Sequence, residues 1–316
     1  MTATTPKAER AAAAAGIAVI DKPQGWTSHQ VVGRVRRLAG TRKVGHAGTL
    51  DPLATGVLVV GIERATKLLG HLTLTDKEYL ATIRLGISTV TDDSEGEPTT
   101  MVGAAEVSDT LVERALEPLR GQILQVPSSV SAVKVAGVRS YARVRAGEDV
   151  ILQPRAVTVT RLEMLNCRPA TAADLAVVDV DVLVECTSGT YVRALARDLG
   201  AALGVGGHLT ALRRTRVGPF DLSMAQTLDD AAAGLDIVDM AQVARRCFPI
   251  RVLDDEQAAH VRHGRRLPGQ RMLADPTALL AESGELLALY RPSGSDAVAV
   301  SVFAAPATAL AEQQHD

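Results

Sequence analysis

The sequence predicts an α+β fold: a central mixed, largely antiparallel sheet flanked by helices, with a small β-rich domain at the C-terminal end. Three observations support this prediction. Strand and helix patterns follow each other without the regular strand–helix–strand repeat of a parallel sheet. Residues 155–165 and 175–187 alternate apolar and polar side chains, as antiparallel strands do. Residues 251–316 contain three short strand patterns separated by Gly and Pro.

The individual elements follow from local signals along the chain. Residues 16–22 form an apolar strand that ends in a turn. Thr27 or Ser28 caps a helix over 28–39, and Gly40 ends it. The later elements are a long loop over 41–56, a buried strand over 56–62, a helix over 63–74, an alternating strand over 77–89, a helix over 107–122, a strand end, turn and helix over 188–203, a strand over 208–225, and helical segments between 228 and 249.

Composition divides the chain into segments. Residues 1–15 form an alanine-rich tail that we expect to be disordered. Residues 16–248 form the main domain, and within it residues 126–150 are unusual because they mix serines, glycines and basic residues. Residues 249–316 form the small β-rich domain, in which strands are predicted at 272–275, 285–291 and 297–303.

The overall composition excludes several classes of protein. Hydrophobic residues make up 47% and charged residues 22% of the 316 residues, an ordinary profile for a soluble globular protein. No apolar run approaches the roughly 18 residues that a membrane-spanning helix needs. The three cysteines, Cys167, Cys186 and Cys247, are far apart and form no CxxC pair. Their spacing favours a reducing, cytoplasmic environment.

The charge is distributed unevenly although the formal net charge is only −2. Single basic clusters are usually solvated helix faces, but five of them on a slightly acidic chain are harder to explain in that way. The net charge therefore does not exclude an anionic partner such as a nucleic acid. The clusters are Arg34, Arg36 and Arg37; Arg42 and Lys43; Arg139, Arg143 and Arg145; Arg213, Arg214 and Arg216; and Arg262, Arg265 and Arg266.

The familiar motifs of nucleotide, hydrolase and metal chemistry are not in the sequence. It contains no GxxxxGK[ST] phosphate loop, no GxGxxG after a strand and no GxSxG elbow. His260 and His263 are three residues apart, but only Asp254, Asp255 and Glu256 stand near them, so a metal site there is weakly supported. We expect no metal site.

One carboxylate, Asp51, stands among small residues in the stretch GHAGTLDPLATG (45–56). Pro52 biases Asp51 toward an extended backbone, and Gly45 and Gly48 permit a close approach of other groups. Asp51 is thus held on a stiff loop that enters a buried strand. An Asx turn that closes the loop is the structural alternative.

Further candidate groups stand in four other segments. Tyr79 begins a strand in KEYLA, Arg193 lies in SGTYVRALARDLG where a strand turns into a helix, and Leu212 precedes three arginines in LRRTRVGPF. The turn DKPQGWTS adds a lysine and a proline. An arginine beside Asp51 would keep the carboxylate ionised and oriented, and Tyr79 would stack on a planar substrate or move a proton.

The segments DKPQGWTS, GHAGTLDPLATGVL, KEY, SGTYVRALARDLG and LRRTRVG, in this order, resemble the bacterial TruB-type tRNA pseudouridine synthases. The resemblance covers most of residues 16–220, and the GHAGTLDPLATG block is long and specific. Residues 249–316 resemble the PUA-like RNA-binding domain of that family more weakly. The resemblance implies the pseudouridine synthase fold and the conversion of the T-loop uridine of tRNA (uridine 55) to pseudouridine, without cofactor or metal.

In this family the aspartate that matches Asp51 is essential. It either attacks C1′ as a nucleophile or abstracts a sugar proton to give a glycal, and the sequence leaves both routes open. The residue matching Tyr79 stacks on the flipped base, the one matching Arg193 pairs with the aspartate, and the one matching Leu212 lines the pocket. The resemblance also implies that Lys22 and Pro23 support the site. It further implies that His46 fills the gap in the stack that the flipped base leaves.

Residues 126–150 match an insertion that closes on the RNA in this family. Lys134, Arg139 and Arg143 would meet phosphates of the tRNA T-arm there. The segment departs from the family pattern at Val130, where a large residue such as tyrosine is expected, and the DKPQGWTS segment departs at Trp26. The resemblance further implies a monomer in the cytoplasm.

Two other functions compete with this one. The chain could be a tRNA-binding or tRNA-folding module without chemistry, although binding alone does not need the set of Asp51, Tyr79 and Arg193. It could also be a glycoside- or nucleoside-cleaving hydrolase, but a retaining hydrolase needs a second carboxylate as its acid. Only Glu185 and Asp198 stand near the matched segments.

Overall fold

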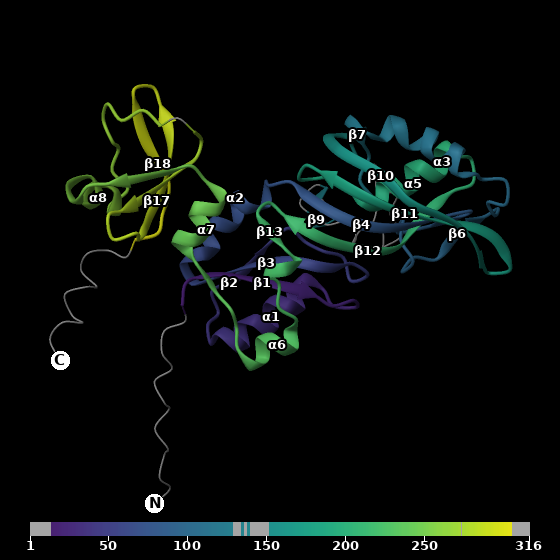
Figure 1. The fold of residues 1–316 in the computed structure, drawn as a ribbon, viewed down its shortest axis with the longest axis horizontal. Helices are drawn as coiled ribbons and strands as arrows, with labels where there is room; N and C mark the ends of the chain where they lie inside the picture. The colour runs from purple at the N-terminus through teal and green to yellow at the C-terminus, as the bar shows by residue number, and fades with distance from the viewer. Residues whose placement is uncertain (1–13, 129–133, 136–137, 140–151, 273, 305–316) are drawn as a thin grey trace, which may run out of the picture.

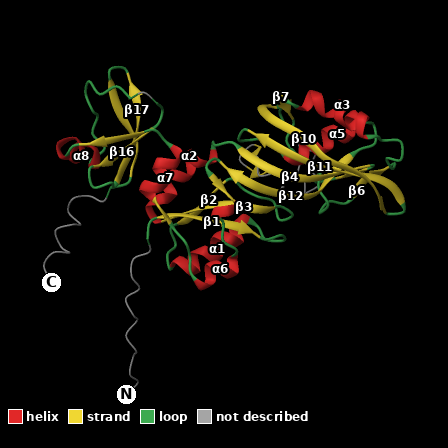
Figure 2. Ribbon diagram, viewed as in Figure 1, coloured by secondary structure: helices red, strands yellow, loops and turns green. Residues whose placement is uncertain are grey.

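The structure is a computed structural model that describes residues 14–128, 134–135, 138–139, 152–272 and 274–304. A ten-stranded and a four-stranded sheet dominate these residues (Figures 1 and 2). No helix in the described part of the chain is long and apolar enough to cross a membrane. The predicted α+β fold with a mixed, largely antiparallel sheet is confirmed.

The larger sheet has the strand order β14-β1-β3-β12-β4-β11-β10-β7, with β2 beside β3 and β13 beside β12. All of its pairings are antiparallel except that of β12 with β3. Its strands are β1 (Gly16–Lys22), β2 (Val44–Ala47), β3 (Thr55–Ile62), β4 (Lys77–Leu85), β7 (Gly121–Gln125), β10 (Arg155–Ala172), β11 (Leu175–Cys186), β12 (Gly207–Val217), β13 (Phe220–Asp221) and β14 (Val238–Asp239).

The first helix forms where its capping residues predict it. Helix α1 (Ser28–Ala39) begins with a capping box between Thr27 and Gln30, and it ends at Gly40 in the left-handed conformation. Its apolar face packs on β1 and β3. The segment expected to be one long loop over 41–56 is instead interrupted by β2, because residues 44–47 pair with β3.

Other helices are shorter than predicted or change type. The segment over 63–74 divides into the 3-10 helix η1 (Glu63–Leu68) and the helix α2 (Leu69–Thr73). Helices α3 (Asp109–Leu116) and α5 (Val192–Ala202) contribute to the core that also contains the inward side chains of β4, β11 and β12. The remaining short elements are β5 (Ile87–Thr89), β6 (Pro98–Met101), η2 (Glu117–Leu119), β8 (Lys134–Val135), β9 (Val138–Arg139), η3 (Leu222–Met224) and α6 (Leu228–Ala233).

The four-stranded sheet follows helix α7 (Met240–Cys247) and is built from the C-terminal residues. Its elements are β15 (Ile250–Leu253), α8 (Asp255–Arg262), β16 (Thr277–Ala281), β17 (Leu286–Ser293) and β18 (Asp296–Val302). The strand expected at 272–275 was wrongly placed: the strand begins at Thr277, after Pro276, because proline has no N–H for a sheet ladder.

The two sheets are joined by one shared apolar cluster. Leu280, Leu286 and Phe303 from the C-terminal part are buried in the same cluster as Leu68 and Leu72 of the first part. Two polar contacts support this packing: Arg64 Nη1 donates to the carbonyl of Phe303 at 2.9 Å, and Lys67 Nζ donates to that of Val302 at 2.8 Å. The C-terminal part is therefore tied to the larger sheet by buried side chains as well as by the chain.

Candidate active site

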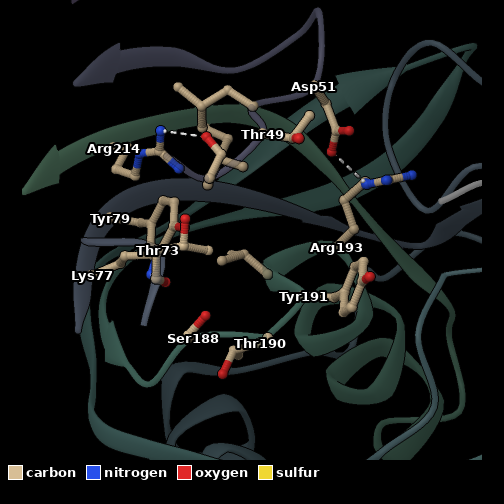
Figure 3. A pocket seen from close by; sticks show the side chains of 15 residues that line it. Thr49, Asp51, Thr73, Lys77, Tyr79, Ser188, Thr190, Tyr191, Arg193 and Arg214 are labelled. Carbon is tan, nitrogen blue, oxygen red and sulfur yellow. Dashed lines mark hydrogen bonds and ion pairs between the residues drawn. The ribbon is translucent and has the colours of Figure 1, made fainter. Parts of the chain in front are cut away.

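A pocket of about 260 Å³ lies where the β2–β3 loop meets β4, β12 and the start of α5 (Figure 3). Asp51, Tyr79, Arg193 and Leu212 all line it. These four residues come from four separate segments of the sequence, so the expectation that they meet in one compact site agrees with the geometry. The pocket is large enough for a nucleobase and part of its sugar.

The loop that carries Asp51 is held from behind by a buried lysine. Lys22 is fully buried, and its Nζ donates to the carbonyls of Pro23 at 2.9 Å, Trp26 at 2.6 Å and Pro52 at 3.3 Å. Burial lowers the pKa of Lys22 to about 8, while the nearby Asp51 opposes the shift. Lys22 thus ties the turn after β1 to the residue that follows Asp51.

A second contact fixes the same loop from the side of α1. The Ser28 hydroxyl donates to the carbonyl of Leu50 at 3.0 Å and accepts from its N–H at 2.9 Å. Ser28 is buried, so both bonds form away from water, where their geometry is well defined. The Asx-turn interpretation therefore does not account for the loop: several residues hold its backbone, and the Asp51 carboxylate points toward Arg193 (Figure 3).

Arg193 is the direct partner of Asp51. Its Nε lies 3.0 Å from Oδ2 of Asp51, and its Nη1 lies 3.5 Å from Oδ2 of Asp93. The same Nη1 donates to the carbonyl of Thr91 at 2.8 Å. The Arg193 and Asp93 side chains are only 7% and 4% exposed, whereas that of Asp51 is 39% exposed. The guanidinium is thus anchored from behind and presents Asp51 toward the pocket.

Asp93 did not emerge from the sequence as a site residue. It lies in the segment TDDSEGEP, whose acidic composition is typical of a solvated turn. In the structure its carboxylate also accepts from the N–H of Glu95 at 3.1 Å, which holds it in place. Only its burial distinguishes it from an ordinary turn residue, and burial here is a product of the tertiary fold.

Two further cations line the opposite side of the pocket. Lys77 and Arg214 lie beside Tyr79, across the pocket from Arg193 (Figure 3). Burial raises the pKa of the Tyr79 phenol, and a hydrogen bond with Arg214 opposes the rise. The phenol therefore stays protonated at neutral pH. The KEYLA and LRRTRVGPF segments contained both cations, but nothing in the sequence distinguished Arg214 from its neighbouring arginines.

The other expected site residues lie outside this pocket. His46 stands edge-on to His29, with ring centroids 5.6 Å apart, and burial lowers its pKa. Lys22 and Pro23 line a neighbouring hollow. Lys134 and Arg139 belong to the short β8–β9 pair, whose side chains lie outside the description, and Arg143 lies outside the described residues, as does Val130.

The two carboxylates considered as a second acid for hydrolysis are engaged elsewhere. Glu185 lies 3.8 Å from Arg161 and 3.9 Å from Arg216, and Asp198 pairs with Arg197 at 2.8 Å. Neither lines the pocket. Among the described residues no group of three or more His, Cys, Asp or Glu is arranged to hold a metal ion.

Three family models match this chain from residue 36 to residue 304. Residues 36–192 match the N-terminal domain of the TruB family pseudouridylate synthases. Residues 193–246 match a tRNA pseudouridylate synthase B C-terminal domain, and residues 248–304 match the C-terminal domain of tRNA pseudouridine synthase II. The chain belongs to the TruB family. Its matched region contains Asp51, Tyr79, Arg193 and Leu212.

Similar full-length TruB family proteins support the assignment. The chain is 56% identical to tRNA pseudouridine synthase B of Arthrobacter sp. (strain FB24), over 92% of this chain and 96% of that protein. It is 59% identical to the protein of the same name from Cutibacterium acnes, over 88% and 93%. The TruB family resemblance seen in five short segments thus extends over nearly the whole chain.

Solved structures of two other complexes contain chains with a similar fold. A chain from an H/ACA RNP bound to a substrate RNA containing 2′-deoxyuridine matches with a TM-score of 0.68 and 26% identity, covering 92% of this chain and 85% of that one. A chain from a Cbf5-Nop10-Gar1 complex matches with a TM-score of 0.66 and 28% identity, covering 91% and 83%. The α+β architecture around the pocket is therefore shared well beyond the closely related sequences.

Proposed function

We propose that this chain isomerises a uridine in the T-arm of tRNA, uridine 55, to pseudouridine, and that Asp51 carries the reaction. The observation that carries the proposal is the Asp51–Arg193 pair at 3.0 Å, partly exposed at the wall of a pocket of nucleobase size. Membership of the TruB family and the tRNA pseudouridine synthase B relatives supply the reaction class and the substrate class.

The reaction breaks the C1′–N1 glycosidic bond, turns the uracil and joins C1′ to C5. Asp51 either attacks C1′ as a nucleophile or takes a proton from the sugar, and both steps need an ionised carboxylate. Arg193 orients this carboxylate, because its Nε lies 3.0 Å from Oδ2 of Asp51 and fixes that oxygen. We expect turnover without a cofactor or an added metal.

The remaining pocket residues would hold the flipped base. Tyr79 offers an aromatic face and Leu212 an apolar contact, and both line the pocket. His46 lies near the Asp51 loop, in β2, from where an imidazole could replace the base in the RNA stack. Lys22 and Pro23 would support the site from behind the loop and not by contact with the base.

We further propose that the enzyme acts as a cytoplasmic monomer with the T-arm as its contact. Residues 16–248 would form the catalytic domain, and Lys134, Arg139 and Arg143 of the insertion at 126–150 would contact phosphates. Residues 249–316 would form a PUA-like RNA-binding domain.

Tritium release from tRNA labelled at C5 of uracil tests the proposal. The wild type, in excess EDTA and without nucleotide, should release tritium, since C5 loses its hydrogen when it joins C1′. Asp51→Asn should release none while it binds tRNA within a few-fold of the wild type. Tight binding without release by the wild type would instead identify a tRNA-binding module. Full release by Asp51→Asn would remove Asp51 from the mechanism.

A further inference from the structure

Lys77 and Arg214 are buried cations without a carboxylate partner among the described residues. Lys77 is 6% and Arg214 is 1% exposed. Lys77 Nζ donates to the carbonyls of Thr73 at 2.9 Å and Thr75 at 2.6 Å. Arg214 donates from Nε to the carbonyl of Val57 at 2.7 Å and from Nη2 to that of Gly48 at 3.0 Å. All four of these acceptors are neutral.

The two cations also converge on one point beneath the Asp51 loop. A Cβ atom added to Gly48 would lie 3.3 Å from Nη1 of Arg214 and 3.6 Å from Cε of Lys77. Burial, followed by the charge of Arg214, lowers the pKa of Lys77 to about 8. Two like charges this close, away from water, repel each other and stay desolvated. Such an arrangement is costly unless an anion joins it during function.

The proposed reaction supplies an anion at this place. When the C1′–N1 bond breaks, its electron pair stays with the uracil, and the negative charge spreads over N1, O2 and O4. The ring then turns, C5 forms a bond to C1′, the hydrogen on C5 leaves as a proton, and N1 takes up a proton. The sum of these steps is an isomerisation that needs no oxidant or co-reactant.

We propose that Lys77 and Arg214 stabilise the detached uracil anion, while Asp51 and Arg193 act on the sugar. Preorganised cations in a pocket that excludes water stabilise developing charge strongly, because they need not reorganise during the reaction. Tyr79 lies beside Lys77 and Arg214, and its phenol is hydrogen-bonded to Arg214, so a base stacked on Tyr79 would lie next to both cations. This inference rests on the proposed function and assigns the half of the reaction that Asp51 does not perform.

The test compares two leaving groups in single-turnover reactions. Fluorine at C5 withdraws electrons, so 5-fluorouracil is the more stable anion and needs less help from the protein. The Lys77→Gln variant keeps two N–H donors for the Thr73 and Thr75 carbonyls but removes the charge. It should cleave uridine in tRNA about 100-fold more slowly than the wild type, the order expected for one lost donor, and 5-fluorouridine less than about 10-fold more slowly.

Controls separate this inference from a structural role and from the proposed function. Lys67→Gln is a matched variant, because Lys67 also donates to a backbone carbonyl, at 2.8 Å, but lies outside the pocket; both rates should stay within about twofold. Lys77→Arg keeps the charge and should recover most of the uridine rate. Tritium release follows the uridine reaction only, because C5 of 5-fluorouridine carries fluorine; loss of the N-nucleoside from nuclease digests follows both substrates, and the thermal midpoint is measured for each variant.

The outcomes are distinct. Equal losses of Lys77→Gln on both substrates, or a Lys77→Arg variant as slow as Lys77→Gln, would overturn the inference and leave Lys77 as a clamp between α2 and β4. If Lys77→Gln does not fold, Arg214→Gln removes the other charge and makes the same comparison: equal losses on both substrates would again overturn the inference. A wild type that converts neither substrate would overturn the proposed function itself.

Discussion

Arg193 and Arg214 are both buried arginines in the wall of one pocket, yet their contacts differ. Arg193 lies between two carboxylates, those of Asp51 and Asp93. Arg214 contacts the carbonyls of Val57 and Gly48 and the Tyr79 phenol. The first arginine has its counter-charge in the resting protein, whereas the second has only neutral partners. The comparison indicates that one side of the pocket is built to orient a permanent anion and the other to receive a transient one.

The largest expected effect comes from replacing Arg193, which lies between the carboxylates of Asp51 and Asp93. Arg193→Met leaves Asp93 buried without its cation and Asp51 without its orienting group. Loss of one partner of a buried pair costs about 3–5 kcal/mol of stability. We expect the single-turnover rate to fall at least about 1,000-fold and the unfolding midpoint in urea to fall. Arg193→Lys should lie between this variant and the wild type, and an unchanged rate for Arg193→Met would contradict the orienting role.

Asp93→Asn should have an intermediate effect. The amide keeps the size of the side chain but removes the charge behind Arg193, so the guanidinium is held less firmly. A hydrogen bond to a charged group contributes about 1.5–3 kcal/mol, which corresponds to roughly 10- to 100-fold in rate. Single-turnover kinetics with saturating enzyme would measure the loss. Asp198→Asn, in a partly exposed pair with Arg197 outside the pocket, is the matched control and should be near the wild type.

The pH dependence of kcat/KM tests the side of the pocket that contains Lys77 and Arg214. The pKa of Lys77 is lowered to about 8, so its charge is lost as the pH rises above 8. The groups that face it are Arg214, Cys186 and Asp76. We expect kcat/KM to fall about tenfold per pH unit above that value.

Lys22 has a similar pKa, about 8, and could produce the same decline. Lys77→Arg distinguishes the two lysines, because an arginine stays charged throughout this range. The decline should disappear in Lys77→Arg. If it persists there, the titrating group is not Lys77.

The smallest expected effect is that of Tyr79→Phe. The ring and its stacking surface remain, and only the hydroxyl that bonds Arg214 is lost. One such bond contributes about 0.5–1.5 kcal/mol, so a loss of roughly 3- to 10-fold in the single-turnover rate is expected. A loss of 100-fold or more would instead indicate that the phenol moves a proton, as general acid–base groups do. Tyr79→Leu, which removes the aromatic face, should be far slower.

Much of the fold could be read from the sequence because its signals are local. The capping residues Thr27 and Gly40 delimit α1, and the alternating residues of β10 and β11 predict those strands. Strand β2 was missed because its four residues, one of them Gly45, carry little pattern, and pairing with β3 stabilises them. The strand expected at 272–275 was displaced because its apolar residues precede a proline.

The sequence by itself determined which side chains are available for chemistry. Asp51, Tyr79 and Arg193 each stand in a short segment of characteristic residue types and spacing. Each segment can therefore be recognised without coordinates. The tertiary structure decided which cations have counter-charges: it buries Asp93 behind Arg193 and leaves Lys77 and Arg214 with neutral carbonyls. Burial and counter-ion distance depend on residues far apart in the chain, and those contacts set the electrostatics of the pocket.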